Sequence, residues 1–168
     1  MGKLRDECKL TPGVPLKPML AKPTKAIGEV LDRFEDKRFT CEYKYDGERA
    51  QVHKLADGTV GVFSRNSEDM SKKYPDLVEQ LPHVGSWPLY EKGISAHGTL
   101  QCIKENTNTF VLDAEAVAID RTTGKLMPFQ ELSKRKRKDV KVEDIQIRVC
   151  LFAFDLLYLN GEVSGRRY

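Results

Sequence analysis

The sequence predicts an α+β fold built on largely antiparallel sheets with flanking helices. Strand-like runs outnumber helical patterns, and several neighbouring runs are separated only by short turns that contain Asp-Gly, Thr-Gly or Asn-Gly. The helical patterns are few and do not alternate regularly with the strands, which is typical of an α+β domain.

Composition indicates a globular chain with a heavily charged surface. The chain has 168 residues, of which 40% are hydrophobic and 32% charged, and its net charge is +3. The cysteines are scattered without metal-ligand spacing, which favours reduced thiols in an intracellular protein over a zinc site or a disulfide framework. No apolar run is long enough to span a bilayer and the N-terminus lacks a signal peptide pattern, so no membrane association is expected.

The N-terminal third predicts an extended segment, a helix and a meander. Residues 1–23 hold four of the eight prolines, so we expect them to be extended and to lie along another part of the fold. Thr24 is the expected N-cap of a short amphipathic helix. Strands are then expected over residues 38–45, 49–55 and 60–64, joined by two Asp-Gly turns. The apolar face of the helix is expected to contain Ile27, Val30, Leu31 and Phe34.

The remaining patterns alternate between clear elements and loops. Pro75 suits the first turn of a second helix, with an apolar face at Leu77, Val78 and Leu81. Residues 82–109 show no sustained period, and 88–109 are expected to be an inserted loop. A strand is expected over 110–119, a turn over 122–125, and the central strand of the sheet within 145–159, followed by a turn at Asn160-Gly161.

Lys44 is the first candidate for chemistry. On its own it fits a solvated strand lysine before an Asp-Gly turn. As a nucleophile it would have to lose a proton, which from the reference lysine pKa costs roughly 4.6 kcal/mol at pH 7. Arg49 begins the next strand and could supply a neighbouring charge, while Glu42 would share the face of Lys44 in a strand.

Glu115 and Arg65 are further candidates. Glu115 interrupts an apolar run, where a carboxylate must be paired, neutral or metal-bound if it is buried. Asp113 shares its strand face, so a solvated acidic face is the alternative, and Asp155 carries the same ambiguity. Arg65 is either a surface arginine or, beside a phosphate-handling lysine, a phosphate or ribose ligand.

Four stretches resemble, in the same order, motifs of the ATP-dependent DNA ligases. They are 42–49 (EYKYDGER), 63–66 (FSRN), 112–118 (LDAEAVA) and 153–162 (AFDLLYLNGE), and they are similar to the first, third and IIIa motifs of covalent nucleotidyltransferases. Residues 15–21 (PLKPMLA) and 128–132 (PFQEL), with the basic run after them, resemble the eukaryotic replicative type.

The resemblance implies an ATP-grasp-like covalent nucleotidyltransferase fold. Residues 1–11 would end a linker from an upstream DNA-binding domain, and residues 12–168 would form part of an adenylation domain. The later glutamate and lysine motifs of the family do not follow residue 162, so the domain is expected to be incomplete at its C-terminus.

The resemblance also implies the roles of the candidate residues. Lys44 would attack the α-phosphate of ATP through Nζ, and Mg²⁺ would neutralise the pyrophosphate. Glu115 would contact the ribose or the catalytic metal. Glu42 would select adenine, Phe154 would stack on it, and the two arginines would hold ribose and phosphates. The implied nucleotide-binding set is Glu42, Lys44, Arg49, Arg65, Glu115 and Phe154.

The implied partner is nicked double-stranded DNA, sealed by a monomeric nuclear enzyme in replication, repair or recombination. A run of five basic residues either contacts the DNA backbone, acts as a nuclear localisation signal, or is a solvated face. Alternative functions are an RNA ligase or mRNA capping enzyme, against which the FSRN and PFQ stretches argue, and a non-catalytic fragment that binds nucleotide or DNA. The basic run is Lys134, Arg135, Lys136, Arg137 and Lys138.

Overall fold

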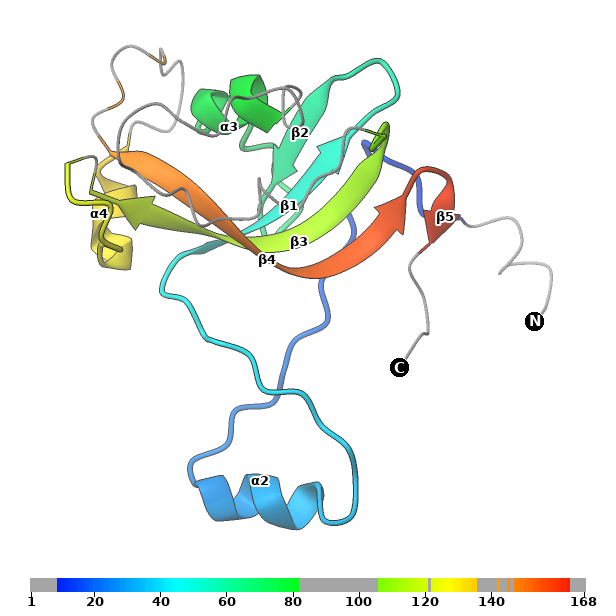
Figure 1. Ribbon diagram of the computed structural model, residues 1–168, viewed down its shortest axis with the longest axis vertical. Helices are drawn as coiled ribbons and strands as arrows, with labels where there is room; N and C mark the ends of the chain where they lie inside the picture. The colour runs from blue at the N-terminus through cyan, green and yellow to red at the C-terminus, as the bar shows by residue number, and fades with distance from the viewer. Residues whose placement is uncertain are drawn as a thin grey trace.

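A five-stranded antiparallel sheet forms the body of the protein in a computed structural model that describes residues 9–81, 106–120, 122–135, 142, 145 and 147–163 (Figure 1). The strand order is β2-β1-β3-β4-β5, and each pair of neighbours is antiparallel. This confirms the predicted α+β class. The strands are β1 (Glu48–Lys54), β2 (Val60–Phe63), β3 (Phe110–Ile119), β4 (Arg148–Leu159) and β5 (Glu162–Val163).

The prediction that the 145–159 stretch holds the central strand is wrong, because β3 occupies that place. β4 pairs with β3 along its length, but within the described part of the chain its other side meets only the two-residue β5. The apolar character of β4 therefore reflects two partly buried faces near the edge of the sheet rather than a central position.

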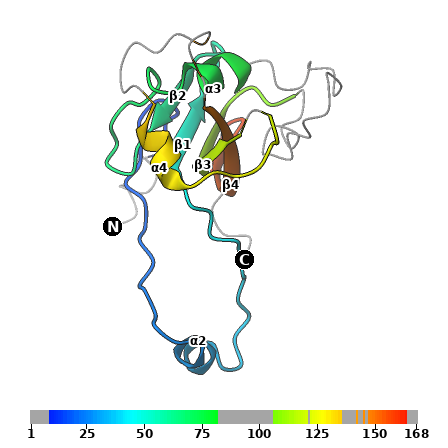
Figure 2. The ribbon, with the colours of Figure 1, turned by 90° about the vertical axis from the view of Figure 1, so that its left-hand side faces the viewer.

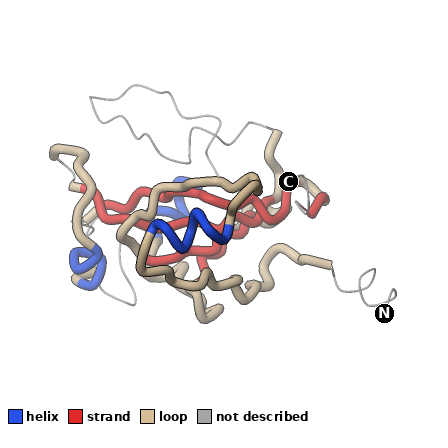
Figure 3. The backbone as a smooth tube through the Cα atoms, turned by 90° about the horizontal axis from the view of Figure 1, so that it is seen from below, coloured by secondary structure: helices blue, strands red, loops and turns tan. Residues whose placement is uncertain are grey.

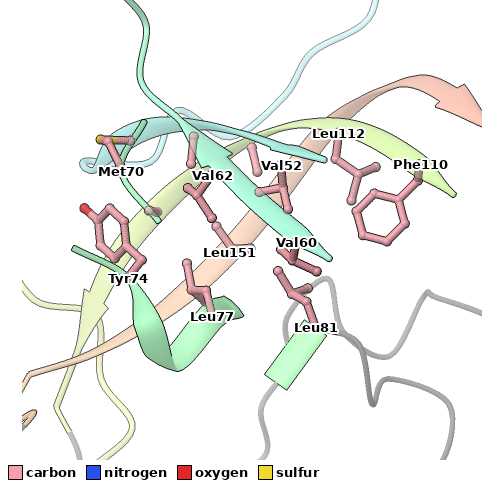
Figure 4. Packing of buried hydrophobic residues seen from close by; sticks show 13 residues of the cluster. Val52, Val60, Val62, Met70, Tyr74, Leu77, Leu81, Phe110, Leu112 and Leu151 are labelled. Atoms are coloured by element: carbon pink, nitrogen blue, oxygen red, sulfur yellow. The ribbon is translucent and has the colours of Figure 1, made fainter. Parts of the chain in front are cut away.

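Helix α3 (Pro75–Gln80) covers one face of the sheet and closes the apolar core (Figure 4). Pro75 lies in its first turn, as predicted, where the missing N–H costs nothing. Helix α3 contacts β2 and β4. Leu77 and Leu81 are buried in one apolar cluster with alternate residues of the strands, whose side chains point to one side because side chains alternate along a strand. The core side chains labelled in the figure are Val52, Val60, Val62, Met70, Tyr74, Leu77, Leu81, Phe110, Leu112 and Leu151.

Three of the predicted turns are present. The Asp57-Gly58 turn joins β1 to β2, with Gly58 at a φ of +85° and the Asp57 carboxylate accepting the Thr59 N–H at 2.9 Å. Asn160-Gly161 joins β4 to β5 with positive φ at both residues, the geometry that favours this dipeptide in two-residue hairpins. The predicted turn at 122–125 returns the chain after β3, where the Asp120 N–H donates to the Lys125 carbonyl at 2.9 Å.

The predicted strand over residues 38–45 is not formed. These residues belong to an excursion, residues 17–47, that leaves the sheet, carries helix α2 (Ile27–Arg33) and returns (Figures 1 and 2). A hairpin across Asp46-Gly47 would need a free side of β1, but β2 and β3 already occupy both sides. The position beside β1 is therefore taken by a strand that is distant in sequence.

Helix α2 forms where expected but begins later and buries no side chain. Ala26, not Thr24, is the N-cap, and no side chain caps the helix. Seen from below, α2 lies in front of the strands (Figure 3), and Ile27 is 79% exposed. The third helix, α4 (Phe129–Ser133), follows the β3 turn and buries Leu132.

Residues 11–16 of the proline-rich segment lie along the face of the sheet opposite α3, as expected of part of that segment. Residues 17–23 instead leave the sheet with the excursion, and residues 1–8 lie outside the described residues. The backbone N–H of Gly13 donates to His53 Nδ1 at 2.9 Å, and that of Leu16 donates to Gln51 Oε1 at 2.7 Å. Both side chains belong to β1 and are buried. Side chains of the sheet thus accept hydrogen bonds from backbone N–H groups of this extended segment, which forms no strand of its own.

Burial makes His53 a determinant of stability at mildly acidic pH. Desolvation lowers its pKa from 6.5 to about 4, although Asp113 opposes the shift. The unfolded chain takes up a proton between these values and the folded protein does not, so stability is full above pH 6.5 and falls as pH drops toward 4. We expect urea unfolding at pH 4.5 to show a loss of roughly 2 to 3 kcal/mol relative to pH 7.5.

The His53→Asn variant provides the control for this pH dependence. Its amide can accept the Gly13 N–H but does not titrate, so its unfolding free energy should change by less than about 1 kcal/mol over the same range. An equal loss in both proteins would show that other groups cause the pH dependence.

Candidate functional site

A cleft of about 430 Å³ opens where β1 begins, beside the turn after β2 and the middle of β3. It brings together three predicted site residues, Arg49, Arg65 and Glu115, although they come from separate motifs. Ser64 and Asn66 of the FSRN stretch also line it, as does Phe129. Three residues of the predicted nucleotide site therefore line one cleft.

Strand register places Arg49 beside Glu115. The two are direct partners in the β1–β3 pairing, so their side chains project from the same face of the sheet. Arg49 Nη2 donates to Asp113 Oδ2 at 2.6 Å, whereas its buried Nε meets no acceptor among the described residues. That unpaired donor is a group that an oxygen of a ligand would satisfy.

The turn after β2 fixes the backbone around Arg65. Ser64 Oγ accepts the N–H groups of Asn66 and Glu68 at 3.2 and 3.1 Å, and the Ser67 N–H donates to the Ser64 carbonyl at 2.9 Å. These bonds hold the loop in a compact turn and leave the Arg65 side chain exposed at the cleft.

Several charged groups act on the Glu115 carboxyl. Burial raises the pKa of this carboxyl, and Lys44, the Gly47 N–H and Arg49 act against that rise. Lys44 is the strongest of these opposing influences, so its ammonium lies close enough to Glu115 for the two charges to interact. Lys44 itself is exposed and does not line the cleft wall.

An aromatic stack anchors the segment that carries Lys44. The Tyr45 ring lies on that of Phe152, with centroids 3.8 Å apart and planes 17° from parallel. Phe152 pairs with Glu115 across β3 and β4, so the stack holds residue 45 beside the same carboxylate. Sequence reasoning missed this contact, because the register of β4 against β3 is not visible in either motif.

Phe154 lies at an irregularity of β4. Asp155 pairs with Asp113 and Ala153 with Ala114, which leaves Phe154 as an extra residue, a β-bulge. Its ring is 41% exposed, and the Arg49 guanidinium lies 5.2 Å from its centroid. The structure thus brings Phe154 to Arg49, with ring surface left open.

Glu42 is the predicted residue that the structure does not bring into this group. It is exposed, and no contact joins it to the cleft within the part of the chain described. The strand face that it was to share with Lys44 does not exist, because residues 38–45 form no strand. That part of the prediction is wrong.

The basic run divides into different environments. Lys134 is exposed and paired with Glu131 at 2.5 Å, and Lys136, Arg137 and Lys138 lie outside the described residues. Arg135 contradicts the predicted DNA contact, because it is buried. Its Nη2 bonds Asp76 Oδ1 at 2.8 Å and its guanidinium lies over the Tyr74 ring. α4 turns Arg135 inward against α3, which a charge run in the sequence does not reveal.

The cleft offers few side-chain ligands for a metal ion. Among the described residues no group of three or more His, Cys, Asp or Glu side chains could hold one. Glu48 lines the cleft, but its carboxylate already accepts from Lys73 and from the Tyr74 hydroxyl. Glu115 and the exposed Glu68 remain as lining carboxylates, a set that fits Mg²⁺ bound mainly to phosphates rather than a closed protein site.

Gly47 lies where the returning excursion meets β3, and no side chain fits there. A Cβ at residue 47 would lie 2.3 Å from the carbonyl oxygen of Ala116 and 2.9 Å from Cγ of Glu115. We expect Gly47→Ala to displace the start of β1, to destabilise the fold by roughly 1 to 3 kcal/mol, and to weaken nucleotide binding. Urea unfolding and ATP titration measure the two effects.

Gly28→Ala is the matched control, because nothing lies within 4 Å of a Cβ at that helical position. It should leave ATP binding unchanged and should not destabilise the fold. Equal behaviour of the two variants would contradict the close approach at residue 47.

No helix among the described residues is long and apolar enough to cross a membrane.

Comparison with known proteins identifies relatives over most of the chain. The family model "ATP dependent DNA ligase domain" matches residues 18–86 and 89–166. DNA ligase 1 of Schizosaccharomyces pombe is 56% identical over 162 residues, covering 96% of this chain and 19% of that protein. DNA ligase 1 of Saccharomyces cerevisiae is 53% identical over 155 residues, covering 92% of this chain and 18% of that protein.

Among solved structures, a mycobacterial DNA ligase D complexed with ATP and MES has a TM-score of 0.48 and 28% identity, covering 73% of this chain and 30% of that one. The chain spans about a fifth of the length of the curated relatives named above.

Proposed function

This chain belongs to the ATP-dependent DNA ligase domain family, and from that premise we propose that it forms a lysyl-AMP intermediate at Lys44. The Nζ lone pair makes a bond to the α-phosphorus of ATP as the bond from that phosphorus to its bridging oxygen breaks. Pyrophosphate leaves with the bonding electrons, and Nζ, an ammonium at the start, loses two of its three protons to solvent and keeps one in the phosphoramidate.

The observation that carries the proposal is the cleft that Arg49, Arg65 and Glu115 share, with Lys44 near enough for its charge to act on Glu115. Glu115 lies beside Arg49 in the strand pairing. An amine and two guanidinium groups around one partly buried carboxylate suit a nucleoside triphosphate, whose negative charges need several cations.

Each nucleotide part has a proposed partner. Arg49 and Arg65 hold phosphates and ribose, with the unpaired Arg49 Nε as one donor. Phe154 offers exposed ring surface for the adenine. Glu42 selects the base by family resemblance, which requires Glu42 to move toward the cleft while Tyr45 stays on Phe152, because Glu42 is exposed and does not line the cleft.

Mg²⁺ is the proposed metal, brought in on the triphosphate and contacted by Glu115. When bound it neutralises charge on the departing pyrophosphate. The role of this chain is to present one carboxylate at the cleft, held beside Arg49 by the strand pairing.

For the whole protein we propose the sealing of nicked double-stranded DNA in the nucleus, in replication, repair or recombination, by a monomer. The AMP would pass to a 5′-phosphate at the nick, and the 3′-hydroxyl would then displace it. Lys134 is the described residue of the basic run whose exposure suits contact with the DNA backbone.

The test is covalent labelling of the protein by ATP that carries a label on its α-phosphate, in the presence of Mg²⁺. We expect an acid-labile, alkali-stable adduct from ATP, as a phosphoramidate requires, and none from ATP labelled at the γ-phosphate. Label from GTP instead would move the assignment to a capping-type enzyme. Absence of label from both nucleotides, with ATP still bound, would leave a domain that only binds nucleotide.

A further inference from the structure

A buried polar network connects the N-terminal segment to Arg49 on the face opposite α3. The segment is residues 11–16, referred to below as the strap. Its Gly13 N–H donates to His53 Nδ1 at 2.9 Å, which makes that nitrogen an acceptor and leaves the proton on Nε2. His53 Nε2 is 3.0 Å from Gln51 Oε1, so it donates there.

Gln51 is the centre of the network, because every hydrogen-bonding position of its amide is used. Oε1 accepts from the Leu16 N–H at 2.7 Å and from His53, while Nε2 donates to the Leu16 carbonyl at 3.3 Å and to Asp113 Oδ1 at 3.2 Å. An amide has two donor and two acceptor positions, so no alternative orientation satisfies the same partners. Its 4% exposure leaves no room for water to replace them.

Asp113 carries this orientation onward to the cleft. Its Oδ1 accepts from Gln51 and its Oδ2 accepts from Arg49 Nη2 at 2.6 Å. Asp113 is 5% exposed, so its carboxylate is oriented by these partners rather than by solvent. Arg49 in turn lies over the Phe154 ring. The Gln51 side chain therefore makes two hydrogen bonds to the strap and one to the Asp113 carboxylate.

We propose that Gln51 is a positioning residue through which the strap sets the orientation of Arg49 toward the nucleotide. The inference rests on the proposed function in one respect, since Arg49 is a nucleotide ligand there. Release of the strap frees the Gln51 amide to rotate, the Asp113 carboxylate loses a donor, and the Arg49 guanidinium loses its fixed direction. Docking of residues 11–16 thereby tunes the affinity of the cleft for ATP.

The test changes the strap and leaves Gln51, Asp113 and Arg49 intact. Leu16→Pro removes the backbone donor to Gln51, whereas the matched control Leu16→Ala keeps it and trims only a partly exposed side chain. We expect Leu16→Pro to raise the Kd for ATP about fivefold and Leu16→Ala to change it less than twofold. NMR of the Arg49 guanidinium in the absence of nucleotide should show faster rotation in Leu16→Pro only.

Gln51→Met, which keeps the length of the side chain and removes both donor and acceptor, should produce the same change in the Arg49 signal. If Leu16→Pro and Gln51→Met are folded and Arg49 behaves as in Leu16→Ala, the proposal is overturned. Failure of the proposed function gives a different result, because wild-type protein would then bind no ATP while the Arg49 signal would still respond to the strap.

Discussion

Lys44→Ala is expected to abolish covalent transfer of AMP, lowering the yield of labelled protein at least about 1,000-fold, the scale on which loss of a nucleophile is felt. In the proposed mechanism the Lys44 amine forms the bond to phosphorus, and no lysine is among the described residues that line the cleft. The measurement is the fraction of protein that carries the α-phosphate label after a fixed time.

Two variants separate chemistry from charge. Lys44→Arg keeps a cation near Glu115 but cannot give up its proton, so it should bind ATP and remain unlabelled. Lys37→Ala removes an exposed lysine from the same excursion and should label normally. Labelling of Lys44→Arg would place the nucleophile elsewhere.

Of the substitutions discussed for this protein, Asp76→Ala should lower the free energy of unfolding most, by roughly 3 to 5 kcal/mol. Arg135 is nearly buried, with a side chain only 3% exposed, and Asp76 is its charged partner at 2.8 Å. Removing the carboxylate leaves a guanidinium without a counter-charge in the interior, where its Nε and Nη1 already have no acceptor among the described residues. Urea unfolding should show a lower midpoint with an unchanged m-value.

The chain offers a close control for this ion pair. Glu131→Ala breaks the neighbouring Lys134 pair, which is largely exposed on the lysine side, and should cost less than about 1 kcal/mol. The double variant Asp76→Leu with Arg135→Met should recover most of the stability, because a buried pair can be replaced by apolar side chains of similar volume. A cost for Asp76→Ala no greater than that of Glu131→Ala would contradict the burial of the pair.

Local patterns predicted the elements whose signals are local. The Pro75 helix start, the Asp57-Gly58 and Asn160-Gly161 turns and the strand over 110–119 depend on a few adjacent residues, and all are present. The antiparallel class followed from those turns. The strand over 38–45 was mispredicted, because the partner beside β1 is decided by β3, which is more than fifty residues away.

The candidate site was predictable as a set of residues but not as an arrangement. Arg49, Arg65 and Glu115 share the cleft, which agrees with their selection from separate motifs. The roles of Gln51, His53 and Tyr45 were invisible, because each depends on a partner that register or the strap supplies. Arg135 was misread as a surface base because four other bases surround it in sequence, while its burial against Asp76 depends on how α4 packs.

Both ends of the excursion over residues 17–47 are fastened to the same strand. Leu16 is bonded to Gln51 at one end, and Glu48 begins β1 at the other. The excursion is therefore a loop whose two ends are held together by the fold. Doubling the length of such a loop raises the entropic cost of closing it by only about 0.6 kcal/mol. Insertions beside α2 should therefore be tolerated. The short connection between β1 and β2, residues 55–59, has no such freedom, because its length fixes the register of the hairpin. The chain can thus vary the size of the excursion while Lys44, close to the second fastening, keeps its place beside Glu115.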